Sequence, residues 1–183
     1  MSDSINKEIA QQDTADGRLN DGGAERGRWA EFTASVLQPY NFSEAIALPL
    51  SGTPMVLAAL TGAQALGLDA GDRVWLAGTI GWRAVTNGKG VTRVDVIFRI
   101  FRNTPVTGLQ LFSIRESAES AFDNFEATSF DHVDINPAAD GNTLVSYFLT
   151  AELPLAGSAA TVIGPVTFIA SELEPGHKPP GCG

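Results

Sequence analysis

Short apolar segments separated by turn-forming residues run through most of this chain, with a turn roughly every eight to fifteen residues. We predict eight or nine strands, over residues 29–37, 42–48, 55–61, 73–85, 92–102, 109–115, 122–133, 144–153 and 162–173. The one stretch of helical composition, residues 61–68, is short and broken by glycine, so we expect no more than a brief helical turn there. Strands without intervening helices exclude parallel βαβ units, and we predict an all-β, antiparallel two-sheet jelly-roll sandwich.

The clearest strand pattern lies in residues 92–102 (TRVDVIFRIFR), where apolar and polar residues alternate. This period of two predicts a half-buried strand, with Val94, Val96, Phe98 and Ile100 on one face and Arg93, Asp95 and Arg99 on the other. The preceding Asn87-Gly88 pair favours a hairpin turn that would join this strand to residues 73–85. Gly164-Pro165 interrupts an apolar run, which predicts a sheet edge or a bulge at that point.

Composition divides the chain into three parts. Residues 1–28 are rich in charge and glycine and hold too little apolar surface to offset the entropy of ordering, so we predict a flexible N-terminal arm. Residues 29–173 form the predicted jelly-roll domain, and residues 174–183 (EPGHKPPGCG) form a Pro/Gly-rich C-terminal tail. An arm of this kind either adds as a strand to a neighbour's sheet edge or remains a simple tail, and the sequence leaves both open.

Charge and cysteine content exclude several classes of protein. The net charge is −9 and there are only three lysines, so the sequence offers no basic surface for nucleic acid. The single cysteine rules out an intrachain disulfide framework or a zinc finger. We expect neither a signal peptide at the N-terminus, which lacks an apolar core, nor a membrane span, because the longest apolar stretch is too short.

No catalytic or cofactor motif emerges. His132 stands between Asp131 and Val133, and in a strand Asp131 and His132 would point to opposite faces, so we expect a surface histidine in a loop. An oxygen-rich group fits no EF-hand spacing and is interpreted as turn chemistry rather than a calcium site; it consists of Asp131, Asp134, Asn136, Asp140 and Asn142. Without a Gly-x-Ser-x-Gly motif or a phosphate loop, we predict a non-enzymatic protein without a cofactor or resident metal.

Charged and tryptophan residues suggest surface contacts. We expect Arg99, Arg102 and Arg115 to share a face with Glu116, Glu119 and Asp123, and we interpret it as solvated surface, with a subunit-contact patch as the alternative. Around Trp75 both faces of the strand are apolar, which is typical of a sandwich centre or an oligomer interface. Core packing is the expected role of at least two of the three tryptophans, Trp29, Trp75 and Trp82.

Three residues are candidates for assembly: Trp29, Trp75 and Cys182. The tryptophans are large and apolar, as interface residues tend to be. Cys182 lies in the predicted tail, where its thiol is either free to form an intermolecular disulfide or incidental.

Several segments together resemble a known family. They are residues 74–81 (VWLAGTIG), 96–103 (VIFRIFRN), the phenylalanines at 122 and 125 leading to Phe130-Asp131, 147–149 (YFL) and 162–168 (VIGPVTF). In order and spacing, residues 73–173 look like the exosporium protein C family of endospore-forming Firmicutes. The resemblance implies a compact β domain in the style of tumour-necrosis-factor and C1q jelly rolls, self-assembly on the spore surface, and no catalysis. The long region before Arg73 and the Pro-rich end depart from the family pattern.

These observations lead to one expected function and one alternative. The first is a self-assembling structural subunit of a spore surface layer, exosporium or extracellular filament, whose partners are copies of itself and other spore-surface proteins. The alternative is a jelly-roll module that binds carbohydrate or a receptor. The sequence leaves open whether the assembly is a trimer, a layer or a filament.

Overall fold

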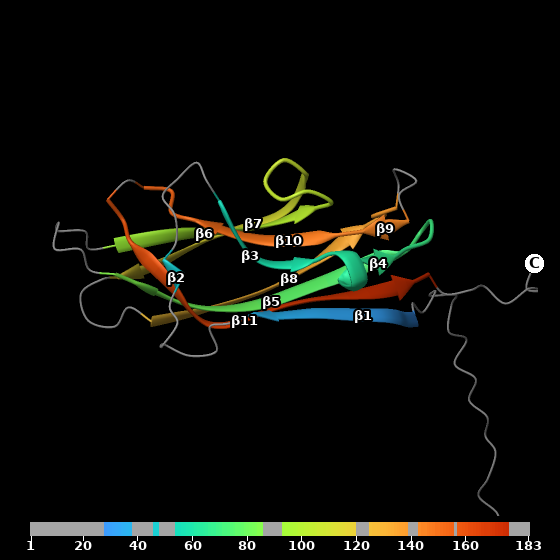
Figure 1. The fold of residues 1–183 in the computed structure, drawn as a ribbon, viewed down its shortest axis with the longest axis horizontal. Coiled ribbons are helices and arrows are strands. Elements are labelled where there is room, and N and C mark those ends of the chain that lie inside the picture. Colours follow the sequence, from blue (N-terminus) through green and yellow to red (C-terminus); the bar gives the residue numbers. More distant parts are fainter. Residues whose placement is uncertain are drawn as a thin grey trace, which may run out of the picture.

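The computed structural model describes residues 28–37, 46–47, 54–85, 93–119, 125–138, 143–155 and 157–175. Two antiparallel sheets make up nearly all of this part. One contains β1 (Arg28–Leu37), β2 (Ile46–Ala47), β5 (Arg73–Ala84), β8 (Phe125–Ile135) and β11 (Ala160–Glu174). The other contains β3 (Met55–Leu60), β6 (Arg93–Arg102), β7 (Leu109–Glu119) and β10 (Tyr147–Glu152), and a small pair joins β4 (Leu66–Gly67) to β9 (Leu144–Val145). Figure 1 shows β6, β7 and β10 in one layer, with β1, β5 and β11 in the layer below.

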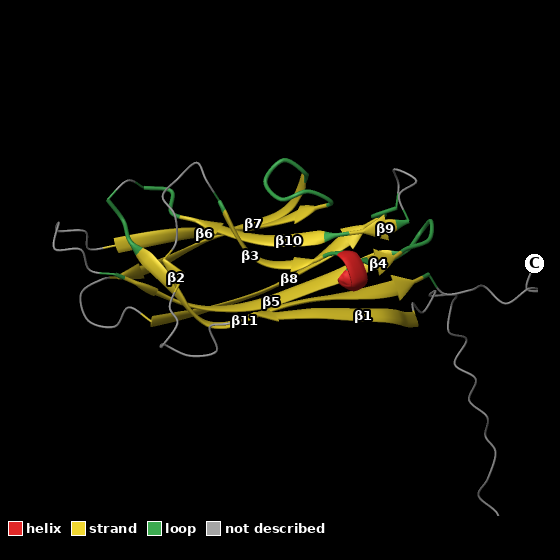
Figure 2. Ribbon diagram, viewed as in Figure 1, coloured by secondary structure: helices red, strands yellow, loops and turns green. Residues whose placement is uncertain are grey.

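The strand orders β1-β11-β5-β8 and β3-β10-β6-β7 define a jelly roll. Along the chain the long strands cross repeatedly between the two sheets, and all pairings are antiparallel. The predicted fold class is therefore confirmed. Figure 2 shows one helical turn beside β4, a 3-10 turn over Gly62–Gln64 that lies within the stretch predicted to be briefly helical.

The core fills the space between the two sheets. The predicted alternation in β6 is confirmed, because Val94, Val96, Phe98 and Ile100 are all fully buried. Opposite them β5 contributes Val74, Leu76, Ile80 and Trp82, and β11 contributes Val166, Phe168 and Ala170. Apolar burial from both layers is the main stabilising term for a sandwich of this kind.

The predicted hairpin between residues 73–85 and 92–102 is wrong. β5 pairs with β11 and β8, whereas β6 pairs with β10 and β7, so the two strands lie in different sheets. The intervening Asn87-Gly88 lies outside the described residues. A local turn signal indicates only that the chain reverses, and the long-range pairing decides whether the next strand joins the same sheet.

Gly164-Pro165 forms the predicted bulge, but β11 is an interior strand and not an edge. The β11–β5 register shifts between Val162 and Val166, and the Gly164-Pro165 peptide bond is cis. β5 passes so close to the bulge that a Cβ at Gly81 would collide with the carbonyl oxygen of Gly164. Glycine at position 81 therefore allows the two strands to approach.

β1 begins at Arg28 and β11 ends at Glu174, each within one residue of a predicted boundary. Most of the predicted arm and tail, including Cys182, lies outside the described residues, as does most of the segment predicted over 42–48. Across the described parts of the chain, no helix has the length and apolar character needed to cross a bilayer.

Candidate association surface

The outer face of the five-stranded sheet is unusually apolar for a surface that faces solvent. The strand registers place its outward side chains in four rows across β1, β11, β5 and β8. In order, these rows are Trp29, Leu173, Arg73 and Ile135; Phe32, Ser171, Trp75 and Val133; Ala34, Ile169, Ala77 and Asp131; and Val36, Thr167, Thr79 and Ser129. We call these four rows the apolar face. An antiparallel sheet with one solvated face normally carries polar residues in these positions.

The two tryptophans proposed from the sequence lie together on this face. The rings of Trp29 and Trp75 meet edge to face, with centroids 5.7 Å apart. A bulge in β1 between Trp29 and Phe32 keeps both side chains on the same face, where they are 61% and 64% exposed. Only Trp82 is in the core, so the prediction that at least two tryptophans pack there is wrong.

The apolar face is not flat. A shallow hollow of about 250 Å³ lies over the centre of the sheet, beside Trp75. Its lining includes the short side chains of Ala77, Thr79 and Ser129 as well as Asp131. The large side chains of the first two rows therefore rise next to a depression formed by the last two.

Two charged residues stand on the apolar face, Arg73 and Asp131. Both side chains are exposed. Within the described part of the chain, neither makes a side-chain hydrogen bond or ion pair. A cation and an anion of this kind are available to a partner.

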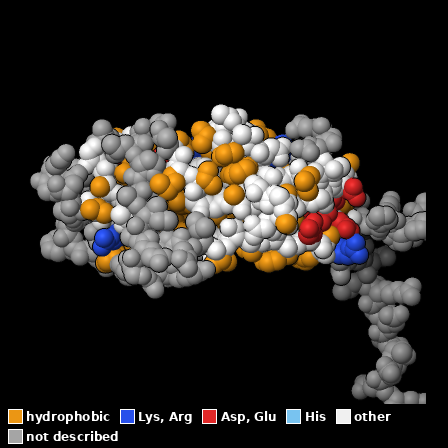
Figure 3. Space-filling view, in the orientation of Figure 1, with side chains coloured by type: hydrophobic (Ala, Val, Ile, Leu, Met, Phe, Trp, Pro, Cys, Tyr) orange, Lys and Arg blue, Asp and Glu red, His pale blue; other side chains and the backbone are white. Residues whose placement is uncertain are grey.

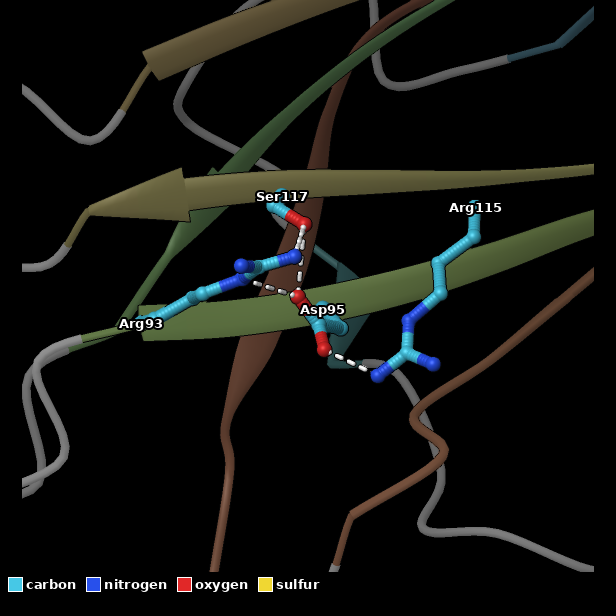
Figure 4. A network of polar contacts seen from close by, with 4 residues as sticks. All are labelled: Arg93, Asp95, Arg115 and Ser117. Atoms are coloured by element: carbon cyan, nitrogen blue, oxygen red, sulfur yellow. Dashed lines mark hydrogen bonds and ion pairs between the residues drawn. The ribbon is translucent and has the colours of Figure 1, made fainter.

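The outer face of the other sheet has the opposite character, because its charges are paired with one another. Figure 4 shows Arg93, Arg115 and Ser117 converging on Asp95 across β6 and β7. Ser117 Oγ and Arg93 Nε donate to Asp95 Oδ1 over 2.6 and 2.8 Å, and Arg115 donates to Oδ2. The hydrogen bond from Ser117, aided by both arginines, lowers the pKa of Asp95 to about 2.

Arg99 on the same outer face pairs with Glu152 of β10, with Nη1 and Oε1 2.5 Å apart. The predicted shared face is therefore right only in part. Arg99, Arg115 and Glu119 do lie on this outer face, but Arg102 is buried against Asp134 and Glu116 lies on the opposite side of β7. The acids that bind Arg99 and Arg115 are Glu152 and Asp95, which the prediction did not include. Asp123, the third acid of that prediction, lies outside the described residues. Because these charges pair with one another, they are less available to a partner than Arg73 and Asp131 on the apolar face.

A buried polar cluster joins the two sheets. Arg102 at the end of β6 approaches both carboxylate oxygens of Asp134 in β8 at 3.2 Å, and Tyr147 Oη donates to Asp134 Oδ2 over 3.1 Å. Burial raises the pKa of Asp134 against the opposing effect of Arg102. Burial also raises the pKa of Tyr147, so the phenol keeps its proton and acts as a donor. Every polar group here has a partner, which is typical of a structural cluster.

A second acidic group lies at the end of the sandwich where β1 begins and β11 ends. Figure 3 shows acidic and basic side chains gathered there. Glu172 is buried next to Asp72, whose Oδ2 accepts a 2.6 Å hydrogen bond from the backbone N–H of Asp69. Burial, followed by the hydrogen bond and charge of Asp72 and the charges of Glu174 and Glu31, raises the pKa of Glu172 to about 7. Arg28 neutralises Glu174 through a 2.7 Å ion pair.

Replacing Glu172 by glutamine is expected to change how stability depends on pH. The folded-state pKa lies above the ordinary value of 4.5, so the folded chain binds the extra proton and loses stability as pH rises from about 4.5 to 7. Glu172→Gln removes this loss and should raise the free energy of unfolding at pH 8 by about 3 kcal/mol, with little change at pH 4.5. Urea unfolding at both pH values measures the change in the free energy of unfolding. The exposed Glu119→Gln is the charge-matched control, and equal effects of the two variants would contradict the prediction.

His132 and the oxygen-rich candidate group for calcium both involve β8. His132 lies in β8 and not in a loop, half-buried, with its ring centroid 5.8 Å from that of Phe112. Asp131 does face the opposite side, as predicted. Among the described residues, no group of three or more potential metal ligands comes together. Asp134 is held by Arg102, and Asp140 and Asn142 lie outside the described residues.

No protein-family model matches the chain, and no curated protein sequence matches it. Solved structures of similar fold include Eiger TNF from S. frugiperda, with a TM-score of 0.42 and 11% identity over 83% of this chain and 98% of that one. A structure of infectious bursal disease virus, Gx strain, has a TM-score of 0.40 and 11% identity over 84% of this chain and 46% of that one. A CBM4 structure has a TM-score of 0.29 and 14% identity, over 79% of this chain and 94% of that one. At these values the likeness concerns the β-sandwich fold and does not bear on function.

Proposed function

We propose that this chain is a non-catalytic structural subunit that associates with copies of itself through the apolar face. The observation that carries the proposal is the contrast between the two outer faces of the sandwich. One carries charges that pair with one another, and the other exposes Trp29, Phe32 and Ile135 at 61%, 64% and 70%. A contiguous exposed apolar patch of this kind marks an interaction site.

The proposed setting is the surface of an endospore, in an exosporium layer or an extracellular filament. It rests on the resemblance of residues 73–173 to the exosporium protein C family. Other spore-surface proteins are the further partners that this setting implies. Cys182, the single cysteine, is proposed to reinforce such an assembly by an intermolecular disulfide.

The hollow beside Trp75 favours a second candidate, a carbohydrate-binding module. Its lining combines an aromatic ring with the hydroxyls of Thr79 and Ser129 and the carboxylate of Asp131. Binding sites for small ligands pair apolar walls with a few polar groups in this way. The two candidates differ in one simple property, because an assembling subunit forms larger particles without any ligand and a binding module does not.

Replacing two of the large residues on the apolar face tests the proposed function. Phe32→Ser/Trp75→Ser is expected to weaken self-association about 100-fold or more, because truncating an aromatic residue at an interface hot spot costs about 2 kcal/mol. Sedimentation velocity over a range of concentrations measures the change. The control is Val56→Ser in β3, which alters an exposed apolar residue of the other sheet and should leave association intact.

Negative-stain electron microscopy of the purified chain, with and without reductant, completes the test. Regular particles, fibres or sheets support the structural function, and their loss in reductant assigns crosslinking to Cys182. If the wild-type chain stays a single copy at every concentration, the structural proposal fails and the carbohydrate module takes its place.

A further inference from the structure

We propose that two copies of the chain pack apolar face to apolar face about a two-fold axis that runs across the strands, between the second and third rows. This inference rests on the proposed function and specifies its contact. It is carried by two properties of the apolar face, its relief and its charge, each of which is complementary to itself. A two-fold contact requires this kind of surface, because the same patch must fit its own copy.

The shape of the apolar face is complementary to its own copy in this arrangement. The axis places the first row of one copy over the fourth row of the other, and the second row over the third. Phe32 then lies over Ala34 of the other copy, Trp75 over Ala77, and Ile135 over Ser129. At these positions large side chains meet short ones, whereas Trp29 lies over Val36 and Val133 over Asp131. The hollow beside Trp75 receives the ridge of the opposite copy. Interface cores reach the packing density of protein interiors through such interdigitation.

The charges fit in the same arrangement. Arg73 stands in the first row on β5, and Asp131 in the third row on β8. The axis places Asp131 of the other copy over the second row of β8. This position is one strand and one row away from Arg73, about 8 Å measured in the plane of the sheet, and an arginine side chain can reach it. The pair forms twice, once on each side of the axis. The two charges left without a partner within the described chain thus neutralise each other between copies.

The size of the apolar face suits a reversible pair. Four strands spaced about 4.8 Å apart, over four rows, cover on the order of 500 Å² per copy. This is less than the roughly 800 Å² per partner of a standard stable interface and more than a typical lattice contact buries. Because a two-fold contact closes at two copies, a filament or layer requires a second surface, and the pair is its building block.

A charge-reversal experiment in the full chain tests this geometry. Arg73→Asp alone and Asp131→Arg alone each bring like charges together twice, so each is expected to weaken self-association at least about tenfold. An equimolar mixture of the two variants places opposite charges at both contacts and should restore association to near the wild-type level. Glu119→Arg, on the outer face of the other sheet, is the control reversal and should have no effect. Sedimentation equilibrium gives the copy number and affinity of each sample.

The possible results separate the inference from the proposed function. Two copies for wild type, single copies for each variant and two copies for the mixture support the two-fold pair, and recovery in the mixture also shows that both variants fold. If Phe32→Ser/Trp75→Ser abolishes association but the charge reversals do not, the apolar face associates in another way and the two-fold pair is wrong. A wild-type particle of three copies overturns it as well. Single copies of wild type at all concentrations overturn both proposals.

Discussion

Replacing Arg102 by methionine is expected to lower the free energy of unfolding by about 3–5 kcal/mol. Arg102 and Asp134 are both almost completely buried, and their ion pair joins β6 of one sheet to β8 of the other. Without the guanidinium, Asp134 becomes a buried carboxylate that, within the described residues, keeps a side-chain hydrogen bond from Tyr147 alone. Burial already raises the pKa of Asp134, and losing Arg102 raises it further, so the variant should recover stability as the pH falls.

Urea unfolding at pH 7 and pH 5 measures the Arg102 effect. The double variant Arg102→Met/Asp134→Leu removes both charges and should regain part of the lost stability. Apolar residues of similar size replace a buried ion pair at little cost, but the buried Tyr147 hydroxyl loses its acceptor. A loss below about 1 kcal/mol for Arg102→Met alone would contradict the burial of this pair.

Replacing Trp82 by alanine is expected to lower the free energy of unfolding by about 3–5 kcal/mol. Trp82 is fully buried in β5, and its ring packs edge to face on Phe98 of the opposite sheet, with centroids 6.3 Å apart. Its indole N–H donates a 3.0 Å hydrogen bond to Thr128 Oγ1, which also loses its partner.

Trp29→Ala is the matched control for Trp82→Ala, because Trp29 is the same residue type and is 61% exposed at the outer surface. We expect it to cost well under half as much stability when the chain is kept dilute enough to remain a single copy. Thermal or urea unfolding compares the two variants, and equal losses would contradict the assignment of one tryptophan to the core and the other to the apolar face.

Local patterns in the sequence predicted the strands well. The alternation of Val94, Val96, Phe98 and Ile100 defines which face of β6 is buried, and a period of two depends only on neighbouring residues. Gly164-Pro165 likewise indicated a bulge through its own backbone preferences. Pairing was harder, because in a jelly roll consecutive strands such as β5 and β6 cross between sheets, and no local signal separates such a crossing from a hairpin.

The sequence also indicated part of the candidate surface. Apolar residues on both sides of Trp75 predicted a sandwich centre or an oligomer interface, and the structure leaves the outer side of β5 without a covering layer in the described chain. Sequence alone did not reveal that Trp29 and Phe32 join this face, because a bulge in β1 sets their direction. The burial of Arg102 was missed for a similar reason, since residues far away in β8 and β10 enclose it.

The most direct test of the central claim is iodide quenching of tryptophan fluorescence as the chain is concentrated. The sequence has three tryptophans; Trp82 is inaccessible in the core, so quenching reports on Trp29 and Trp75. Association through the apolar face predicts that quenching falls as the copy number measured by sedimentation rises. If the copy number rises while quenching stays constant, the copies meet elsewhere and the apolar face is not the association surface.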